Sequence, residues 1–370
     1  GEQCVVLSIQ ARRSIELASG WEVMIEAGRE RTGLDLIDWI KIAQKLGVGE
    51  IFVTSVDKDG TQKGPDLDLL QLMNGEVKVP LIFGGGFNNN KEIKQVLKLD
   101  SISGISIGAA LHYKEIEIQK LKSYLVTNDL PLRNYLPSST ISRSVIKKKV
   151  KVVVIDYGMG NQQSLKNSLE FIGCEVILSD DSKIIESSEI AILPGVGSFP
   201  SGMDELKSRG LVDTIINRFK TGKAIFGICL GMQLLFEGST EFKDTKGLGI
   251  FKGYITNLKD QEDSNKINNH TKLITETRVP HMGWNILNRI VGKCIYIKND
   301  DLIRESFYFV HNYAASKAVD LDFYLTTNYS STHPIAMCGK ERTIGFQFHP
   351  ERSGEAGLKL LEEIINNIKE

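Results

Sequence analysis

Short apolar runs alternate with amphipathic stretches through the first part of the chain. Runs of strand length lie at residues 4–9, 51–54, 79–83 and 104–107. Between them, stretches such as 34–46 and 91–97 place apolar residues at helical spacing. This alternation is typical of parallel strands with helices outside. Because a closed (β/α)8 barrel needs eight such units, the pattern predicts a partial barrel of about four βα units.

A second alternation begins near residue 151. It predicts strands at 152–155, 175–178, 190–193 and 224–228, and later segments at 307–310, 323–326 and 343–348 complete an α/β domain with a mixed sheet. The stretch between the two alternations carries prolines, serines and basic residues without an apolar period. We therefore expect domains at 1–125 and 151–370, joined by a linker at 126–150.

Composition narrows the class of protein. The 370 residues are 41% hydrophobic and 25% charged, with a formal net charge of −1, so neither a nucleic acid nor a membrane is an expected partner. The five cysteines are odd in number and widely spaced, which favours a reducing cytoplasm over a disulfide framework or a metal site. No cofactor is predicted. The chain opens with Gly1, so we expect a fragment or a processed product.

The segment KAIFGICLGMQLLF places Cys229 between an apolar strand and a helix-forming run. A nucleophile on a sharp strand-to-helix turn needs small neighbours, which Gly227 and Gly231 supply. A thiol at the start of a helix is also favoured as the thiolate. We therefore predict that Cys229 is a nucleophile.

The segment TIGFQFHPERS supplies a base for that thiol. His349 and Glu351 follow a strand two residues apart, as an imidazole and a carboxylate that sets its tautomer. His281 and His311 have no such neighbour, and we interpret them as structural or peripheral.

The third requirement is a set of N–H donors for an oxyanion. The segment ILPGVGSF runs from a strand into a Pro-Gly-x-Gly turn. The predicted donors are the amides of Gly195, Val196, Gly197 and Leu230.

Residues 151–370 resemble the class I glutamine amidotransferase subunit of imidazole glycerol phosphate synthase. The motifs that carry this resemblance are IDYGMGN, LPGVGSF, GICLGMQLLF, VPHMGWN, YFVHNY and GFQFHPE. The resemblance implies glutamine hydrolysis through a glutamyl thioester on Cys229, with ammonia passed to a synthase partner. It also implies that the Pro-Gly-Val-Gly loop rearranges when the partner binds substrate, and that the partner faces residues 281–284, 308–311 and Arg352.

Residues 1–125 resemble the carboxyl-terminal half of the cyclase subunit of the same synthase, on the stretches RTGLDL, GVGEIFVTSVDKDGTQKGPDL, VPLIFGGG and ALHYKEI. The resemblance implies that loops after the later strands bind one phosphate of a ribulosyl aminoimidazole substrate, and that Glu50 lies at the barrel end facing the glutaminase. Glycines at strand ends expose N–H groups that anions accept. The predicted phosphate-binding residues are Thr54, Asp59, Gly60, Gly85, Gly86, Gly108 and Ala109.

Two departures separate the first domain from the cyclase pattern. Gln10 stands where the family has a catalytic Asp, and an amide cannot exchange that proton. The second catalytic Asp belongs to the barrel half that this chain lacks, so a missing amino-terminal barrel half or a synthase partner is expected.

Two functions therefore stay open. One is an imidazole glycerol phosphate synthase of histidine biosynthesis, and the other is an ammonia-donor pair that serves a sugar amidotransferase of surface polysaccharide synthesis. A third reading, a scaffold without activity, conflicts with the intact Cys229, His349 and Glu351.

Overall fold

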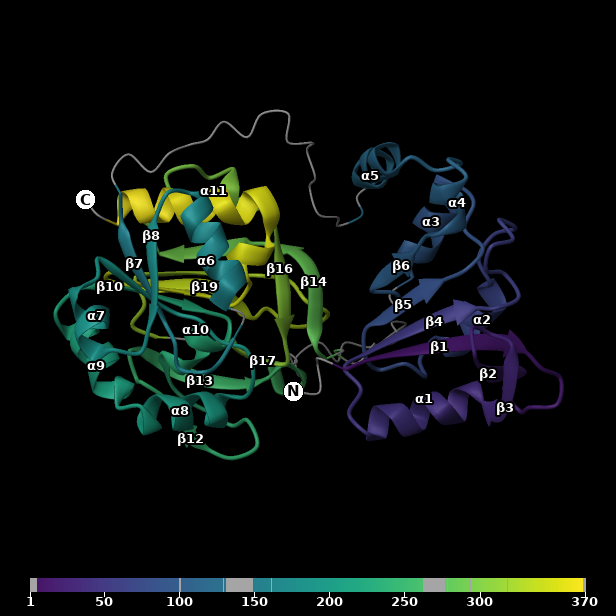
Figure 1. The fold of residues 1–370 in the computed structure, drawn as a ribbon, viewed down its shortest axis with the longest axis horizontal. Helices are drawn as coiled ribbons and strands as arrows, with labels where there is room; N and C mark the ends of the chain where they lie inside the picture. Colours follow the sequence, from purple (N-terminus) through teal and green to yellow (C-terminus); the bar gives the residue numbers. More distant parts are fainter. Residues whose placement is uncertain are drawn as a thin grey trace, which may run out of the picture. The chain divides into compact units, whose positions relative to one another are not determined.

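The computed structural model describes residues 5–99, 101–128, 130, 149–160, 162–261, 277, 279–292, 294–317 and 319–368. The chain divides into two compact units (Figure 1). The first unit holds Gly1–Leu132 with Lys272–Gly283, and the second holds Arg133–Thr271 with Trp284–Glu370. Most of the linker predicted at 126–150 lies outside the described residues, and α5 (Ile118–Val126) reaches its first position.

A six-stranded sheet with the order β3-β2-β1-β4-β5-β6 forms the first unit. Strands β1, β4, β5 and β6 run parallel, which confirms the four predicted βα units. The strands are β1 (Val6–Arg13), β2 (Trp21–Ile25), β3 (Glu30–Asp35), β4 (Glu50–Ser55), β5 (Leu81–Gly84) and β6 (Gly104–Ser106). The helices are α1 (Leu36–Lys45), α2 (Leu67–Met73), α3 (Asn90–Leu97), α4 (Ala109–His112) and α5.

The amphipathic stretches of the first unit become helices because their ends are capped. Asp35 accepts hydrogen bonds from the N–H groups of Ile37 and Asp38 at the start of α1. Asn89 caps α3 in the same way. One face of α1 is buried, and α3 buries Ile93 and Val96. The helices predicted at 34–46 and 91–97 are confirmed to within two residues at each end.

Strands β2 and β3 form an antiparallel hairpin that the hydrophobic pattern does not predict. Four consecutive residues of β2 are buried, so no period-2 alternation marks it. One of them is Glu22, whose carboxylate accepts hydrogen bonds from Arg31 Nε at 2.7 Å and from the Gly33 N–H at 2.8 Å. These bonds lower the pKa of Glu22 against the effect of burial, with the Gly33 bond the largest cause. A charged residue inside β2 thus interrupts the apolar pattern from which a strand would be predicted.

An eight-stranded mixed sheet with the order β15-β18-β19-β20-β10-β9-β7-β8 forms the centre of the second unit (Figure 1). The five strands from β20 to β8 are parallel, whereas β15, β18 and β19 are antiparallel. The mixed sheet is as predicted. Its strands are β7 (Lys151–Ile155), β8 (Glu175–Ser179), β9 (Ile190–Leu193), β10 (Ala224–Ile228), β15 (Asn288–Gly292), β18 (Phe323–Thr326), β19 (Ile335–Lys340) and β20 (Thr343–Phe346).

The second half of the chain also forms two smaller sheets. One has the order β12-β11-β13-β17, with β11 (Phe236–Ser239), β12 (Thr245–Lys246), β13 (Phe251–Asn257) and β17 (Tyr313–Ala315). The other pairs β14 (His281–Ile286) with β16 (Ser306–His311). The strand predicted at 307–310 is therefore present, but it belongs to this two-stranded sheet and not to the mixed sheet.

Helices cover both faces of the mixed sheet, because its parallel strands are buried on both sides. Val152 and Val154 pack with α6 (Gln162–Phe171) and α11 (Gly354–Asn367), and the alternate residues Val153 and Ile155 pack on the opposite face. That opposite face carries α7 (Ser182–Ser187), α8 (Phe199–Ser208), α9 (Leu211–Lys220) and α10 (Leu230–Leu234). Short 3-10 turns are η2 (Leu258–Gln261), η4 (Leu302–Arg304) and η5 (Pro350–Arg352).

A buried guanidinium joins the amino ends of two strands in this sheet. Arg218 of α9 is 1% exposed and donates to the carbonyls of Ser188 and Glu189 before β9 and of Ala224 in β10, at 3.1, 3.3 and 2.9 Å. It also donates to the carbonyl of Ile185. Burial lowers the pKa of Arg218 to about 10, so the group stays charged at neutral pH.

Candidate active site

Cys229 lies between β10 and α10 on a strained turn. Its φ of 52° and ψ of −109° are unusual for a residue with a side chain, and its exposed fraction is 6%. A Cβ on Gly231 would lie 1.8 Å from the Leu193 carbonyl oxygen, and one on Gly227 would lie 2.7 Å from the Met232 Cα. Both glycines are therefore required by close approach of the backbone. Helix α10 has five residues, so its dipole contributes little to the thiolate.

His349 and Glu351 form a buried pair. His349 Nδ1 is 2.7 Å from Glu351 Oε1, and the two side chains are 4% and 6% exposed. His349 Nε2 is buried and has no hydrogen-bond partner in the structure. Burial alone would lower the pKa of His349, but the Cys229 sulfur and the Glu351 carboxylate outweigh it and raise the pKa to about 10. The raised pKa favours the imidazolium form of His349, whose Nδ1–H donates to Glu351 and whose Nε2 carries the second proton.

The strand that carries His349 is tied to the turn that carries Cys229. β10 and β20 are parallel neighbours, and the Cys229 N–H donates to the Phe346 carbonyl at 2.7 Å. The Cys229 Sγ lies 3.9 Å from the Val310 carbonyl oxygen and 3.9 Å from Gln347 Nε2. The mixed sheet thus brings together the three residues that the two motifs predict.

The loop after β9 carries the other predicted donors. The Leu230 N–H donates to the Gly195 carbonyl at 3.3 Å, and the Tyr157 hydroxyl donates to the Pro194 carbonyl at 2.6 Å. Gly197 has a φ of +126°, and Val196 is 42% exposed. The loop lies beside Cys229, but it presents a carbonyl to the Leu230 amide. That amide is not free for an oxyanion in this conformation.

The predicted phosphate-binding residues of the first unit lie at the carboxyl edge of its parallel strands. Thr54 of β4 and Ser106 of β6 both pair with Gly84 of β5, so the loops that follow emerge from one edge. The members in these loops are Asp59 and Gly60 after β4, Gly85 and Gly86 after β5, and Gly108 and Ala109 after β6.

Close packing holds the glycines of these loops. Gly85 and Gly86 have φ values of +103° and +90°, and a Cβ on Gly86 would lie 2.2 Å from the Gly64 carbonyl oxygen. The Asp59 N–H already donates to the Ser55 carbonyl at 2.9 Å. Gly108 precedes α4, which has four residues and no side-chain cap. Gly85 and Gly86 therefore adopt the positive φ values expected of glycine turns, whereas the Asp59 N–H is already hydrogen-bonded within the protein.

Gln10 lies on the same edge. It pairs with Thr54 of β4 and Met24 of β2, and its Oε1 is buried without a hydrogen-bond partner. Glu50 is at the opposite end of β4, where burial raises the pKa of its carboxyl. The amide at which the sequence departs from the cyclase pattern thus lies inside β1, which continues to Arg13, and beside Thr54 near the carboxyl end of β4.

Family models match both parts of the chain. Residues 153–367 match the model described as glutamine amidotransferase class-I, and residues 1–117 match the model described as histidine biosynthesis protein. The chain belongs to the class-I glutamine amidotransferase family. The enzyme class and the α/β fold class predicted from the motifs are thereby confirmed, and this glutamine amidotransferase carries a histidine-biosynthesis segment at its amino-terminal side.

Curated relatives of the amidotransferase part are named imidazole glycerol phosphate synthase subunit HisH. The protein from Lactococcus lactis is 38% identical over 220 residues, covering 59% of this chain and 99% of the relative. The protein from Bacillus velezensis is 41% identical over 216 residues, covering 57% and 93%. A solved glutamine amidotransferase has a TM-score of 0.39 and 17% identity, over 58% of this chain and 98% of that one.

The residues predicted to face a partner differ in exposure. The rings of Trp284 and Tyr308 lie 5.6 Å apart, and the Arg352 guanidinium lies 5.2 Å from the Tyr308 ring centre. His281 and His311 are buried, and His311 Nδ1 lies 3.0 Å from the Tyr313 carbonyl oxygen. Trp284, Tyr308 and Arg352 thus form one aromatic and cationic group, whereas the two histidines are interior residues.

Sequence reasoning misses three residues around Cys229: Tyr157, Gln233 and Gln347. Tyr157 is fully buried, and burial together with the Cys229 charge raises its pKa. Gln233 and Gln347 are buried amides joined by a hydrogen bond of 3.1 Å. The available signal for Gln347 is its position in the GFQFHPE motif, two residues before His349.

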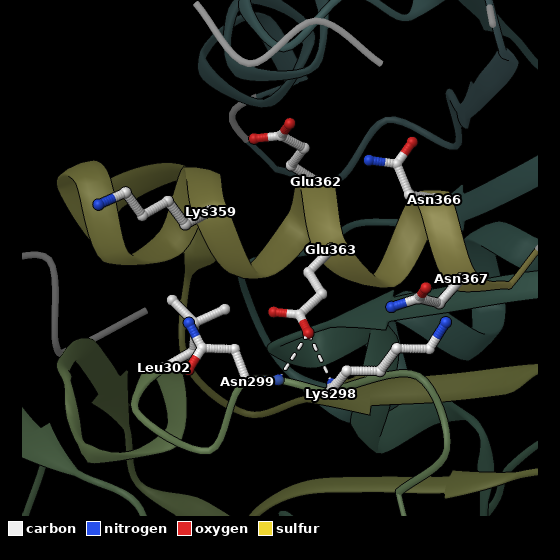
Figure 2. Close-up of a pocket in the computed structure, with 8 residues that line it drawn as sticks. All are labelled: Lys298, Asn299, Leu302, Lys359, Glu362, Glu363, Asn366 and Asn367. Atoms are coloured by element: carbon white, nitrogen blue, oxygen red, sulfur yellow. Dashed lines mark hydrogen bonds between the residues drawn. The ribbon is translucent and has the colours of Figure 1, made fainter. Parts of the chain in front are cut away.

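A surface hollow of about 400 Å³ lies between α11 and the segment that leads into η4 (Figure 2). Glu363 closes one side of it by accepting hydrogen bonds from the N–H groups of Lys298 and Asn299 at 2.6 and 2.8 Å. None of the predicted site residues lines it. Within the described ranges, the His, Cys, Asp and Glu side chains form no group that could hold a metal ion. Of the helices described, none is long and apolar enough to span a membrane.

Proposed function

We propose that this amidotransferase hydrolyses glutamine with Cys229, His349 and Glu351. The observation that carries the proposal is the buried 2.7 Å hydrogen bond that His349 Nδ1 donates to Glu351, with Cys229 on the adjoining strand turn close enough to raise the pKa of His349. In this assignment, Glu351 sets the tautomer and His349 accepts the thiol proton.

The reaction proceeds through a glutamyl thioester. The Cys229 thiolate attacks the amide carbon, and the His349 imidazolium returns the proton to the nitrogen, which leaves as ammonia while the C–N bond breaks. Water then attacks the thioester carbon while His349 takes a proton from it, the C–S bond breaks to release glutamate, and the proton returns from His349 to the Cys229 sulfur. Each tetrahedral intermediate carries an oxyanion that needs N–H donors.

The donors proposed for that oxyanion are the amides of Gly195, Val196, Gly197 and Leu230. Because the Leu230 N–H is bonded to the Gly195 carbonyl, the loop must turn before this amide faces the substrate. Rearrangement on binding of a synthase substrate fits that requirement, and it would link glutamine hydrolysis to use of the ammonia.

We propose that the ammonia serves a cyclase-type synthase of histidine biosynthesis, which forms imidazole glycerol phosphate and an aminoimidazole carboxamide ribotide. Support comes from the match of residues 1–117 to a histidine biosynthesis family and from relatives named as synthase subunits. Residues 1–125 would bind a phosphate of the ribulosyl aminoimidazole substrate, and 126–150 would link them to a glutaminase domain at 151–370. A complementary barrel half or synthase partner completes this proposal, with a cytoplasmic location.

Gln10 favours a second candidate. A glutaminase and barrel pair that only delivers ammonia to a sugar amidotransferase needs no acid or base at that position. The two candidates share the triad and differ in the acceptor of the ammonia.

The triad is tested with Cys229→Ala. We expect glutaminase turnover to fall by at least about a thousandfold, as for loss of a covalent nucleophile, with unchanged thermal unfolding. The matched control is Cys174→Ala, because Cys174 is also 6% exposed but lies between α6 and β8, outside the turn that joins β10 to α10. Turnover that survives in Cys229→Ala would remove the triad assignment.

The acceptor is tested by measuring ammonia release with and without the ribulosyl aminoimidazole substrate and a supplied amino-terminal barrel half. Stimulation together with imidazole glycerol phosphate would establish the histidine role. Glutaminase activity without a cyclised product would support the ammonia-donor role.

A further inference from the structure

Gln347 lies just after β20, two residues before His349. Its neighbours Phe346 and Phe348 pack in the aromatic core with Phe309. Gln347 is fully buried, and its N–H donates to the Ala336 carbonyl at 2.8 Å. Its side-chain Nε2 lies 3.9 Å from the Cys229 Sγ, so the side chain is directed toward the Cys229 turn.

The orientation of the Gln347 amide is set by Gln233. Gln233 Nε2 donates to the Tyr313 carbonyl at 2.8 Å and to Gln347 Oε1 at 3.1 Å. A backbone carbonyl only accepts, so the nitrogen of Gln233 is identified by its partner. Gln347 Oε1 is then the acceptor, and its Nε2 is the atom that lies 3.9 Å from the Cys229 Sγ.

The sulfur thus has a donor and an acceptor as neighbours. The Val310 carbonyl oxygen, 3.9 Å away, can accept from the thiol S–H, whereas Gln347 Nε2 can donate to sulfur. Loss of the thiol proton removes the bond to Val310 and strengthens the bond from Gln347, because hydrogen bonds to ions are shorter and stronger.

We propose that Gln347 is a positioning residue that holds the Cys229 thiolate through its side-chain N–H, with Gln233 fixing the amide. This inference rests on the proposed function, in which Cys229 is the nucleophile. The thiolate is then stabilised before substrate binds. An apolar side chain of the same size would fill the space without this donor.

The test uses the full chain and compares Gln347→Met with the wild type. Alkylation of Cys229 by iodoacetamide is followed from pH 5 to 10 by mass spectrometry of the Cys229 peptide, together with thiolate absorbance near 240 nm. We expect the midpoint of the profile to rise by about one pH unit and the rate near neutral pH to fall about tenfold, as for loss of one hydrogen bond to a charged group. The profile belongs to the coupled Cys229–His349 pair.

Two further variants separate a donor from a space-filling amide. Gln347→Glu keeps the shape but places a carboxylate beside the sulfur, so the midpoint should rise further than in Gln347→Met. Gln261→Met is the matched control, because Gln261 lies in η2 and its Nε2 donates to the carbonyls of Thr256 in β13 and Ala314 in β17. The control should keep the wild-type profile.

A folded Gln347→Met protein with the wild-type profile overturns the inference, and so does an equal shift in Gln261→Met. If Gln347→Met does not fold, Gln233→Leu decides, because it frees the Gln347 amide to rotate; a shift of the same sign supports the inference and none overturns it. Glutaminase activity that survives in Cys229→Ala would instead mean that the proposed function is wrong. The two failures are therefore distinguishable.

Discussion

The Cys229 site of the second unit and the glycine-loop edge of the first unit differ in their side chains for proton transfer. Around Cys229, an imidazole and a carboxylate are buried together and bonded to each other. At the carboxyl edge of the first unit, the glycine turns are held by packing, but the side chain beside Thr54 is the amide of Gln10. Anion-binding turns depend on backbone shape, whereas proton transfer depends on single side chains, so the two properties can be lost separately.

The largest effect expected in this comparison is that of Glu351→Gln. The amide oxygen can still accept from His349 Nδ1, but it carries no charge to stabilise the imidazolium. We expect glutaminase turnover to fall by about two to four orders of magnitude, measured as ammonia release. Glu355→Gln is the control, since Glu355 pairs with Lys359 on α11. Wild-type turnover in Glu351→Gln would break the contrast between the two sites.

Gly231→Ala tests how far the Cys229 site depends on backbone spacing. The new Cβ would lie 1.8 Å from the Leu193 carbonyl oxygen, so we expect the free energy of unfolding to fall by about 3 kcal/mol or more, as for overpacking. Gly222→Ala is the control, with open space and a φ of +67°, and should cost only about 1 kcal/mol. Chemical denaturation measures both, and equal losses would show that the turn is not closely packed.

Gln10→Asp sharpens the contrast from the other side. It restores a carboxylate at this position without touching the Cys229 site, so glutaminase turnover should stay within about twofold of wild type. With a complementary barrel half and the ribulosyl substrate, we expect about tenfold more imidazole glycerol phosphate than from the wild type, by gain of one acid-base group. Absence of product from both proteins would favour the ammonia-donor role.

The smallest effect concerns the charge on His349. Cys229 is the larger of the two influences that raise the pKa of His349 to about 10, while burial lowers it. Cys229→Ala should therefore lower the pKa of His349, and the ring should lose its proton at a lower pH. NMR of the imidazole Cε1–H during a pH titration measures this shift. An unchanged midpoint would mean that the sulfur and the ring do not interact.

The sequence predicts the parallel strands well because buried parallel strands are continuous apolar runs. It also brings out the Cys229 turn, since glycines on both sides of a cysteine leave a local signal. The β2–β3 hairpin escapes prediction because Glu22 is buried by bonds to Arg31 and Gly33 that only the fold reveals. Hydrogen bonds between distant residues, such as Leu230 to Gly195, are equally invisible in a pattern.

The hydrophobic pattern also does not show which sheet β16 joins. The apolar residues of β16 predict a strand, but which sheet it joins depends on pairing with β14. Gln347 is hidden for a similar reason, since a polar residue next to a motif reads as solvent-facing. Its burial follows from Gln233 and Ala336, which lie far from it in sequence or on a neighbouring strand.

The bonds made by Arg218 separate two roles within the mixed sheet. The amino ends of β9 and β10 contribute to stability, whereas their carboxyl ends carry the candidate active site. Arg218 joins carbonyls before β9 and in β10 at their amino ends, while the carboxyl ends of the same strands lead to Gly195 and Cys229. Replacing Arg218 would leave these buried carbonyls without a donor, at about 1–3 kcal/mol each, a large fraction of the stability of a domain. Changes at Arg218 would therefore alter how long the enzyme survives in the cell and leave the rate of each surviving molecule intact.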